Sequence, residues 1–204
     1  MPEVVAGTDG VRRCAWGTSS PDYVAYHDDE WGRPVLDDTR LYEKLCLEGF
    51  QSGLSWLTIL RKRDAFRRAF AGFDPERVAR FTSRDVDRLL QDASIVRHRG
   101  KIDATIANAR ATLDVRDDAG SLAALLWSFE PSRHPAPKRF GDLAPTTAES
   151  KAMSKELLRR GFRFVGPTTA YSTMQACGIV NDHLARCTAR QRCEEERRAL
   201  KRPT

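Results

Sequence analysis

Two pairs of cysteine and histidine lie at opposite ends of the chain and offer four metal-binding side chains. Cys14 and His27 are near the start, and His183 and Cys187 are near the end. On a helix, the four-residue spacing of His183 and Cys187 would place both side chains on one face. Together the pairs form a Cys2His2 set of the kind that zinc prefers, which would tie the two ends of the fold together. The alternative is that the four side chains only pack, because free cysteine behaves as a small buried hydrophobe.

Glu48 is a second candidate for chemistry, because its carboxylate falls among apolar positions. It follows Leu41 by seven residues and Leu45 by three, so on a helix all three side chains lie on one side. Burying a carboxylate is costly unless it has a partner or a function. Glu48 is therefore either a functional acid or a residue held by an ion pair or by the backbone near Ser52 and Gly53.

Aromatic residues gather in the N-terminal part of the chain. They are Trp16, Tyr23, Tyr26, Trp31 and, later, Trp56. Such residues usually form a core, but stacked rings beside one carboxylate also hold a flat, cationic or extruded base. Because Trp56 closely follows the Ser52 and Gly53 pair, its ring and the Glu48 carboxylate can face one cavity.

A short basic turn covers residues 94–101, with the sequence SIVRHRGK. The side chains around its glycine, Gly100, are those of Arg97, His98, Arg99 and Lys101. A glycine-containing turn that leads into a helix offers backbone N–H groups and the positive end of the helix dipole to a phosphate. Basic side chains add the release of counterions. The turn therefore fits duplex DNA binding without base reading, although basic surface turns without a function are common.

Helices are needed to position these residues, and helical patterns run through most of the chain. Asp37 and Asp38 can cap a helix that breaks at residues 52–53, and a second helix begins near Leu54. Further helices are expected after Pro75, from Ser83, from 102 to about 117 and over 151–160. A proline-rich loop over 131–145 precedes the last of them. No alternating pattern of useful length predicts a strand, so the expected fold class is all-α.

The composition limits the classes of protein that fit the chain. Of its 204 residues, 41% are hydrophobic and 30% are charged, which suits one globular domain and excludes disorder. No signal peptide and no apolar run of about 18 residues is present, so we expect a cytoplasmic protein. Five cysteines, an odd number, favour a metal or free thiols over disulfides. The formal net charge of +6 favours an anionic partner, with nucleic acid first.

Six motifs occur in order along the chain. They are CAW at 14–16, YHDDEWG at 26–32, CLEGFQSGLSW at 46–56, IVRHRGKI at 95–102, GFRFVG at 161–166 and MQACGIVNDH at 174–183. Together they resemble the 3-methyladenine DNA glycosylase I family from about residue 14 to residue 187. The resemblance implies a helix-hairpin-helix DNA glycosylase fold with one structural zinc per chain, bound by Cys14, His27, His183 and Cys187. We expect a single domain over 11–187 and a flexible basic tail over 188–204.

The resemblance also implies an activity, which is removal of 3-methyladenine from alkylated double-stranded DNA by hydrolysis of the N-glycosidic bond. Methylation at N3 leaves the base positively charged and a good leaving group, so recognition would supply most of the catalysis. The implied pocket for the flipped base is formed by Trp16, Tyr23, Tyr26, Glu48, Trp56 and Ser172. In it, Glu48 would accept hydrogen bonds from the edge of the base. We expect a monomer that has no membrane partner.

The implied DNA contacts come from two segments. Phosphates would contact the basic turn, through Arg97, His98, Arg99, Gly100 and Lys101. Segment 51–55, with Gln51, Gly53 and Leu54, would probe or fill the gap left in the duplex.

The sequence does not decide which residue activates the attacking water. Many proteins of the wider superfamily use an aspartate after the hairpin for this purpose, and the family that this chain resembles lacks it. Asp103 lies nearest to that place, at a position expected to be solvated. Glu48 either activates water or only binds the base.

Two other classes of function fit parts of the sequence. A zinc hydrolase or base deaminase would combine zinc, a glutamate and nucleic acid, and the stretch from His27 to Glu30 suggests one. However, the H-x-E and P-C-x-x-C signatures are missing, and four protein ligands leave no open position for water. A DNA-binding module without catalysis would explain the charge and the basic turn, but not a carboxylate beside an aromatic cluster.

Overall fold

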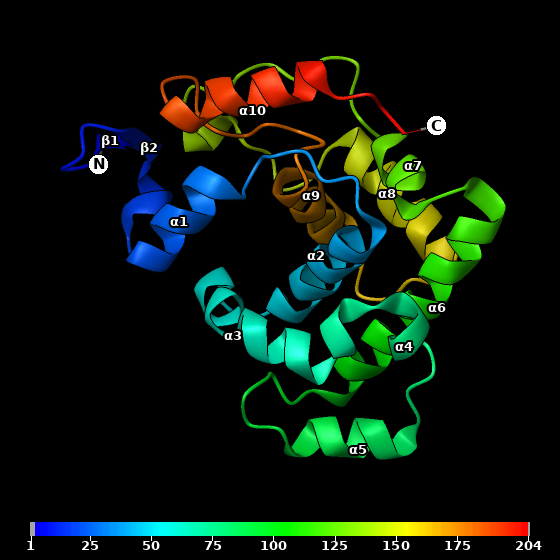
Figure 1. The fold of residues 1–204 in the computed structure, drawn as a ribbon. Helices are drawn as coiled ribbons and strands as arrows, with labels where there is room; N and C mark the ends of the chain where they lie inside the picture. Colours follow the sequence, from blue (N-terminus) through cyan, green and yellow to red (C-terminus); the bar gives the residue numbers. More distant parts are fainter. Residues whose placement is uncertain (1–2, 204) are drawn as a thin grey trace.

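A computed structural model describes residues 3–203, and most of them are helical (Figure 1). Two short strands come first, β1 (Val4–Ala6) and β2 (Arg12–Cys14). The α-helices are α1 (Pro21–Asp29), α2 (Asp38–Gln51), α3 (Trp56–Ala69), α4 (Pro75–Val78), α5 (Ser83–Gln91), α6 (Arg99–Ala119), α7 (Leu122–Trp127), α8 (Ala148–Arg159), α9 (Pro167–Ala176) and α10 (Thr188–Ala199). Short 3-10 helices are η1 (Ala15–Thr18), η2 (Ala71–Phe73) and η3 (Phe140–Asp142).

The central helix of the fold is α2, which packs against α3, α6, α7 and α9 (Figure 1). Every residue of α2 from 41 to 50 is buried, and the apolar ones among them belong to the main core. The Tyr42 hydroxyl donates a 2.8 Å hydrogen bond to the carbonyl of Thr105, which ties α2 to α6. Residues on α2 are therefore held on several sides by neighbouring helices.

The predicted start and break of α2 are confirmed. Asp37 caps the helix by accepting a 2.9 Å hydrogen bond from the N–H of Arg40. Gly53 has a φ of 80°, a left-handed conformation that glycine adopts without steric cost, and the chain turns there. Ser55 then caps α3 by accepting a hydrogen bond from the N–H of Thr58. The two helices are thus joined by an exposed segment at 52–55.

The sequence analysis missed several elements. β1 and β2 form an antiparallel pair in which Val4 faces Cys14, so the all-α expectation is corrected to a mostly helical fold. Each strand has only three residues, which is too short for a recognisable alternating pattern. The six-residue helix α7 also lacked a clear periodic signal.

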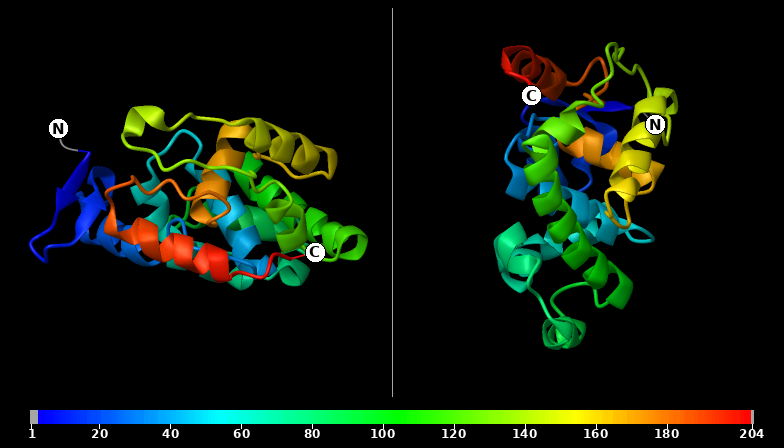
Figure 2. Two further views of the ribbon diagram at one scale, coloured as in Figure 1. Left: turned by 90° about the horizontal axis from the view of Figure 1, so that it is seen from above. Right: turned by 90° about the vertical axis from the view of Figure 1, so that its right-hand side faces the viewer.

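The flexible tail expected over 188–204 is wrong, because α10 occupies 188–199 and packs on the body of the protein. Cys193 and Arg197 are buried there. The Arg197 guanidinium donates 2.8 Å hydrogen bonds to the Gly178 carbonyl and to the Glu130 carboxylate. Figure 1 and the right view of Figure 2 place α10 at one end of the molecule and α5 at the other.

No helix within residues 3–203 combines the length and the apolar character needed to cross a membrane. The 21-residue helix α6 has the length, but it carries charged side chains such as those of Asp103, Arg110 and Asp114. Its face toward the core is lined instead by Ile102, Ile106 and other buried residues.

Candidate active site and metal centre

A pocket of about 290 Å³ opens between η1, α1, α2, α3 and α9. Its walls are formed by Trp16, Tyr23, Tyr26, Trp31, Glu48, Gln51, Trp56, Ser172 and Gln175. The six pocket residues implied by the family resemblance are all among them. The volume lies near the lower end of the range of about 300–1,000 Å³ that is typical of small-molecule sites. It suits a single flat heterocycle.

Aromatic rings form most of the wall, and they pack against one another. The Trp16 ring lies edge-on to Tyr23 at 5.6 Å and to Trp31 at 5.0 Å, measured between ring centroids. The Tyr26 and Trp56 rings are 5.3 Å apart. The Tyr23 hydroxyl accepts a 3.1 Å hydrogen bond from the N–H of Leu57, which joins α1 to α3. These contacts create rigid ring faces that can stack on a base.

The Glu48 carboxylate is the acidic group of this pocket. Its residue is only 6% exposed, and burial raises the pKa of the carboxyl from 4.5 to about 8, although the nearby Lys44 ammonium opposes the shift. Within residues 3–203, Glu48 forms no ion pair and accepts no hydrogen bond. The alternatives considered from the sequence, an ion pair or a bond to the backbone near Ser52 and Gly53, are therefore not found. A buried carboxylate without protein partners is free to interact with a ligand.

The indole N–H of Trp56 is a second unsatisfied group of a pocket residue. It is buried and finds no acceptor in the part of the chain that the structure describes. An unpaired buried donor is costly, and such groups are rare in folded proteins. The pocket residues thus include both a donor and an acceptor whose hydrogen bonds the protein itself does not complete.

The segment at the end of α2 lies beside this pocket. Gln51 lines the pocket, and residues 52–55 are exposed. Leu54 is one of the large apolar side chains exposed to solvent, at 41%. An exposed leucine three residues after a residue that lines the pocket is suited to enter a duplex.

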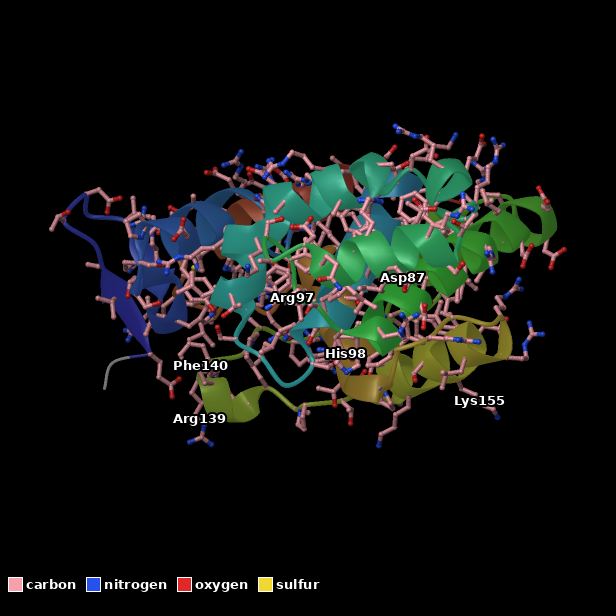
Figure 3. All side chains as sticks on the ribbon, turned by 90° about the horizontal axis from the view of Figure 1, so that it is seen from below. Asp87, Arg97, His98, Arg139, Phe140 and Lys155 are labelled. Carbon is pink, nitrogen blue, oxygen red and sulfur yellow. The ribbon has the colours of Figure 1, made fainter. Side chains whose placement is uncertain are left out.

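The basic turn connects α5 to α6 at the end of the molecule opposite α10. The His98 side chain caps α6 by accepting a 3.2 Å hydrogen bond from the N–H of Lys101. Arg97 is exposed, and Figure 3 shows it with His98 on the face seen from below. Arg99 is also exposed and forms a 2.8 Å ion pair with Asp87 of α5. Arg97 and Arg99 can therefore reach a phosphate from this face.

Lys101 does not fit the phosphate-contact role predicted for it. The residue is only 7% exposed, and its ammonium donates hydrogen bonds to the carbonyls of Phe50, at 2.8 Å, and Ser52, at 2.6 Å. These carbonyls end α2, where a cation is stabilised by the negative end of the helix dipole. The sequence placed Lys101 in a basic cluster and gave no sign of this distant partner.

The four predicted metal ligands come together in a buried cluster. The Sγ atoms of Cys14 and Cys187 and the ring nitrogens of His27 and His183 all lie within 4.8 Å of one another. Cys187 Sγ is 3.4 Å from His27 Nε2 and 3.6 Å from His183 Nδ1, and Cys14 Sγ is 4.0 Å from His183 Nδ1. These separations suit a tetrahedral ion with metal–sulfur bonds of about 2.3 Å and metal–nitrogen bonds of about 2.0 Å.

Surrounding groups orient both histidines toward this cluster. The Asp28 carboxylate lies 2.7 Å from His27 Nδ1, and the Arg13 guanidinium holds Asp28 in turn. The Trp31 carbonyl lies 2.9 Å from His183 Nε2. Hydrogen bonding of this kind at the outer nitrogen fixes the tautomer whose inner nitrogen binds a metal. The residues therefore fit a metal ion.

The chain reaches this geometry in a different way from the one predicted. His183 and Cys187 lie in an irregular segment between α9 and α10, and not on a helix. The N–H of Cys187 donates to the Leu184 carbonyl, so a turn brings the two side chains together. A hydrogen bond from the Cys14 thiol lowers the pKa of Cys187, which favours the thiolate that a metal binds.

Three pocket residues were not assigned to the pocket from the sequence. Trp31 was noticed only as an aromatic residue, and Gln51 only as part of the DNA-probing segment. Gln175 was missed altogether. It lies one helical turn after Ser172 on α9, so the three-residue spacing on one helix face would have identified it.

Comparison with known proteins gives consistent matches over nearly the whole chain. Residues 16–191 match the family model described as methyladenine glycosylase. DNA-3-methyladenine glycosylase 1 of Escherichia coli K12 is 48% identical over 180 residues, which cover 87% of this chain and 96% of that protein. DNA-3-methyladenine glycosylase of Haemophilus influenzae is 44% identical over 178 residues, which cover 86% and 96%.

A solved structure supports the same assignment. It is the structure of 3-methyladenine DNA glycosylase I from Staphylococcus aureus, and it concerns how that protein recognises 3-methyladenine. It matches with a TM-score of 0.83 and 38% identity, and the match covers 87% of this chain and 96% of that one.

Proposed function

Because the chain belongs to the methyladenine glycosylase family, we propose that its aromatic pocket receives 3-methyladenine flipped out of alkylated DNA. The enzyme is a DNA-3-methyladenine glycosylase, which hydrolyses the N-glycosidic bond of this base in base excision repair. The observation that carries the assignment of the pocket is Glu48, a buried carboxylate without protein partners among ring faces. This combination complements a flat cation.

The charge of the lesion explains why such a simple site is sufficient. In DNA the methylated adenine is cationic, and it leaves as a neutral base when the glycosidic bond breaks. A good leaving group needs little protonation by the enzyme, so no general acid is required at the base. The ring faces of Trp16 and Tyr26 attract a cation, and the Glu48 carboxyl group adds a full opposite charge when it is ionised. An undamaged adenine is neutral and gains neither interaction.

Glu48 is assigned first to recognition, with its carboxylate accepting hydrogen bonds from the base edge. As the acidic residue that lines the pocket, it is also the side chain that could position the attacking water. Asp103, the residue nearest to the aspartate of other superfamily members, lies on α6 and is not among the residues that line the pocket.

Double-stranded DNA would be bound through the basic turn and the rim of the pocket. We assign phosphate contacts to Arg97 and Arg99, together with the backbone around Gly100. We assign filling of the duplex gap to Gln51, Gly53 and Leu54, because their segment is exposed and adjoins the pocket. Recognition of phosphate and of the lesion would then use two separate surfaces.

We also propose that the metal held by the Cys/His cluster is zinc, with a structural role. A set of two thiolates and two imidazoles is the donor set that zinc prefers, and four protein ligands leave no position for a reacting water. The ion would join β2 and α1 to the segment before α10, so that residues 11–187 and α10 form one domain.

The activity is tested by incubating the purified protein with methylated DNA and identifying the product. Free 3-methyladenine is the expected product. A deaminated base would instead indicate a zinc deaminase, and bound DNA with no product would indicate a DNA-binding module without catalysis.

A further inference from the structure

Gln175, on the wall of the pocket, belongs to a buried hydrogen-bond network. Its amide Nε2 donates a 2.7 Å hydrogen bond to Oδ2 of Asp182. The Asp182 side chain is fully buried and also accepts a 2.7 Å hydrogen bond from the Tyr171 hydroxyl. His134 Nε2, in the proline-rich loop, lies 2.6 Å from Oδ1 of the same carboxylate. None of these four residues has a part in the phosphate or metal contacts described above.

This network fixes which way the Gln175 amide points. A flipped amide would place its oxygen 2.7 Å from a carboxylate oxygen, so that two acceptors would face each other in a buried place. The amide nitrogen must therefore face Asp182. The amide oxygen, which points away from Asp182, remains the acceptor that Gln175 can offer to the pocket.

The backbone around Gln175 is held equally firmly. Its carbonyl accepts a 3.1 Å hydrogen bond from the N–H of Gly32, next to the pocket residue Trp31. Ser172 lies one turn earlier on the same face of α9 and lines the same pocket. A side chain restrained at both its backbone and its amide nitrogen presents a preorganised acceptor.

We propose that the Gln175 amide oxygen accepts a hydrogen bond from the 6-amino group of the bound base, and that Asp182 positions it to do so. This proposal rests on the proposed function of the pocket. The 6-amino group has two N–H bonds, so the Glu48 carboxylate can take one and the Gln175 oxygen the other. Gln175 is then a residue that selects adenine lesions.

Selection follows from the chemistry at position 6 of a purine. Adenine has an amino donor there, whereas guanine and hypoxanthine have a carbonyl acceptor. A 6-oxo base would place its oxygen against the Gln175 oxygen, which leaves both acceptors unpaired in a buried site. Sites built to pair with a polar group reject analogues that lack it much more strongly than apolar pockets do.

Binding of two free bases to the complete protein tests this inference, with 3-methyladenine and 3-methylhypoxanthine as probes. They share the ring and the methyl group and differ at position 6. Tryptophan fluorescence would report binding, since Trp16, Trp31 and Trp56 line the pocket. Gln175→Leu should weaken 3-methyladenine binding about tenfold, which is the loss of about one hydrogen bond, and leave 3-methylhypoxanthine binding unchanged or stronger, because the acceptor that opposes its 6-oxo group is removed. Gln191→Leu, the same change at an exposed position on α10, is the matched control.

Asp182→Asn tests the positioning step, because an amide at 182 no longer dictates which way Gln175 faces. It should reduce the preference for 3-methyladenine over 3-methylhypoxanthine while the melting temperature and the metal content show an intact fold. Gln175→Met serves as a second variant if the leucine variant does not fold. If Gln175→Leu lowered the affinities for both bases equally, Gln175 would only contribute to the shape of the pocket, and the proposal would be overturned. No change in either affinity would overturn it as well. Failure of the protein to release 3-methyladenine from DNA would instead contradict the proposed function.

Discussion

The Lys101 ammonium donates a 2.6 Å hydrogen bond to the carbonyl of Ser52, which joins the basic turn to the segment beside the base pocket. A second bond, to the Phe50 carbonyl, holds the last turn of α2, the helix that carries Glu48. The surface assigned to phosphates and the segment assigned to the duplex gap are therefore mechanically connected.

Lys101→Met should destabilise the fold and leave the electrostatics of DNA binding intact. The buried carbonyl of Phe50 and the partly buried carbonyl of Ser52 would lose a charged donor, for which we expect a cost of about 2–3 kcal/mol in the free energy of unfolding. Urea unfolding measures this cost. Lys62→Met is the matched control, because the Lys62 ammonium also bonds two carbonyls, of Ala93 and Ser94, but on an exposed part of the surface. A cost for Lys101→Met no larger than for Lys62→Met would contradict the structural role.

Arg97→Ala should have the opposite signature. An exposed arginine that contacts one phosphate contributes about 0.9 to the slope of log affinity against log salt, so the slope should fall by about that amount. Binding should weaken to a similar extent on any duplex sequence, with unfolding unchanged. Arg198→Ala, on α10 at the other end of the molecule, is the control and should leave the slope as it is. An unaltered slope for Arg97→Ala removes the turn as a phosphate site.

Local signals in the sequence were sufficient to predict α2 and the place of Glu48. Asp37 is a cap by residue type, and the Ser52 and Gly53 break follows from the conformations that these residues favour. The helical period predicted that Glu48 is buried, as it is, although all its neighbours from 41 to 50 are buried as well. Each of these features depends on interactions within a few residues.

The features that were missed depend on partners far away in the chain. Lys101 looks like any residue of a basic cluster until its ammonium meets α2, about fifty positions earlier. The buried side of α10 consists largely of Cys193 and Arg197, so it has no apolar stripe, and Arg197 is tolerated there because Glu130 pairs with it. The orientation of Gln175 depends likewise on Asp182 and the loop around His134. Such pairings follow from the packed fold and leave no periodic pattern.

Elemental analysis of protein purified without chelator should find one zinc per chain. His183→Ala should lose the metal and lower the free energy of unfolding by several kcal/mol, because both ends of the fold are released. Cys193→Ala is the matched control, since this buried cysteine lies outside the cluster and its loss should cost only about 1 kcal/mol with zinc retained. Protein that contains no zinc yet keeps full thermal stability would refute the metal assignment.

Burial of Glu48 should make stability depend on pH. The folded carboxyl has a pKa of about 8, against 4.5 in the unfolded chain, so the folded state binds more protons between these values. Stability must then fall as the pH rises from about 4.5 to 8, by at most about 4–5 kcal/mol from this group. Glu48→Gln removes that loss. Its advantage in melting temperature over the unchanged protein should be small at pH 5 and largest near pH 8, and an advantage independent of pH would exclude this cause.

Excision should show the converse dependence on pH, because the ionised form of Glu48 is the one that complements a cationic base. For the free enzyme, kcat/KM for 3-methyladenine release should rise by up to tenfold per pH unit as the pH increases toward 8, and then level off.

Glu48→Gln keeps the size of the side chain and removes the charge. We expect it to slow single-turnover release by about tenfold to a thousandfold, or about 1.4–4 kcal/mol, and to flatten the profile. Affinity for undamaged duplex should barely change, since those contacts are to phosphates. If the Glu48→Gln variant excised the base at the wild-type rate, Glu48 would have no role in the site. The aromatic rings and Gln175 would then form the recognition surface.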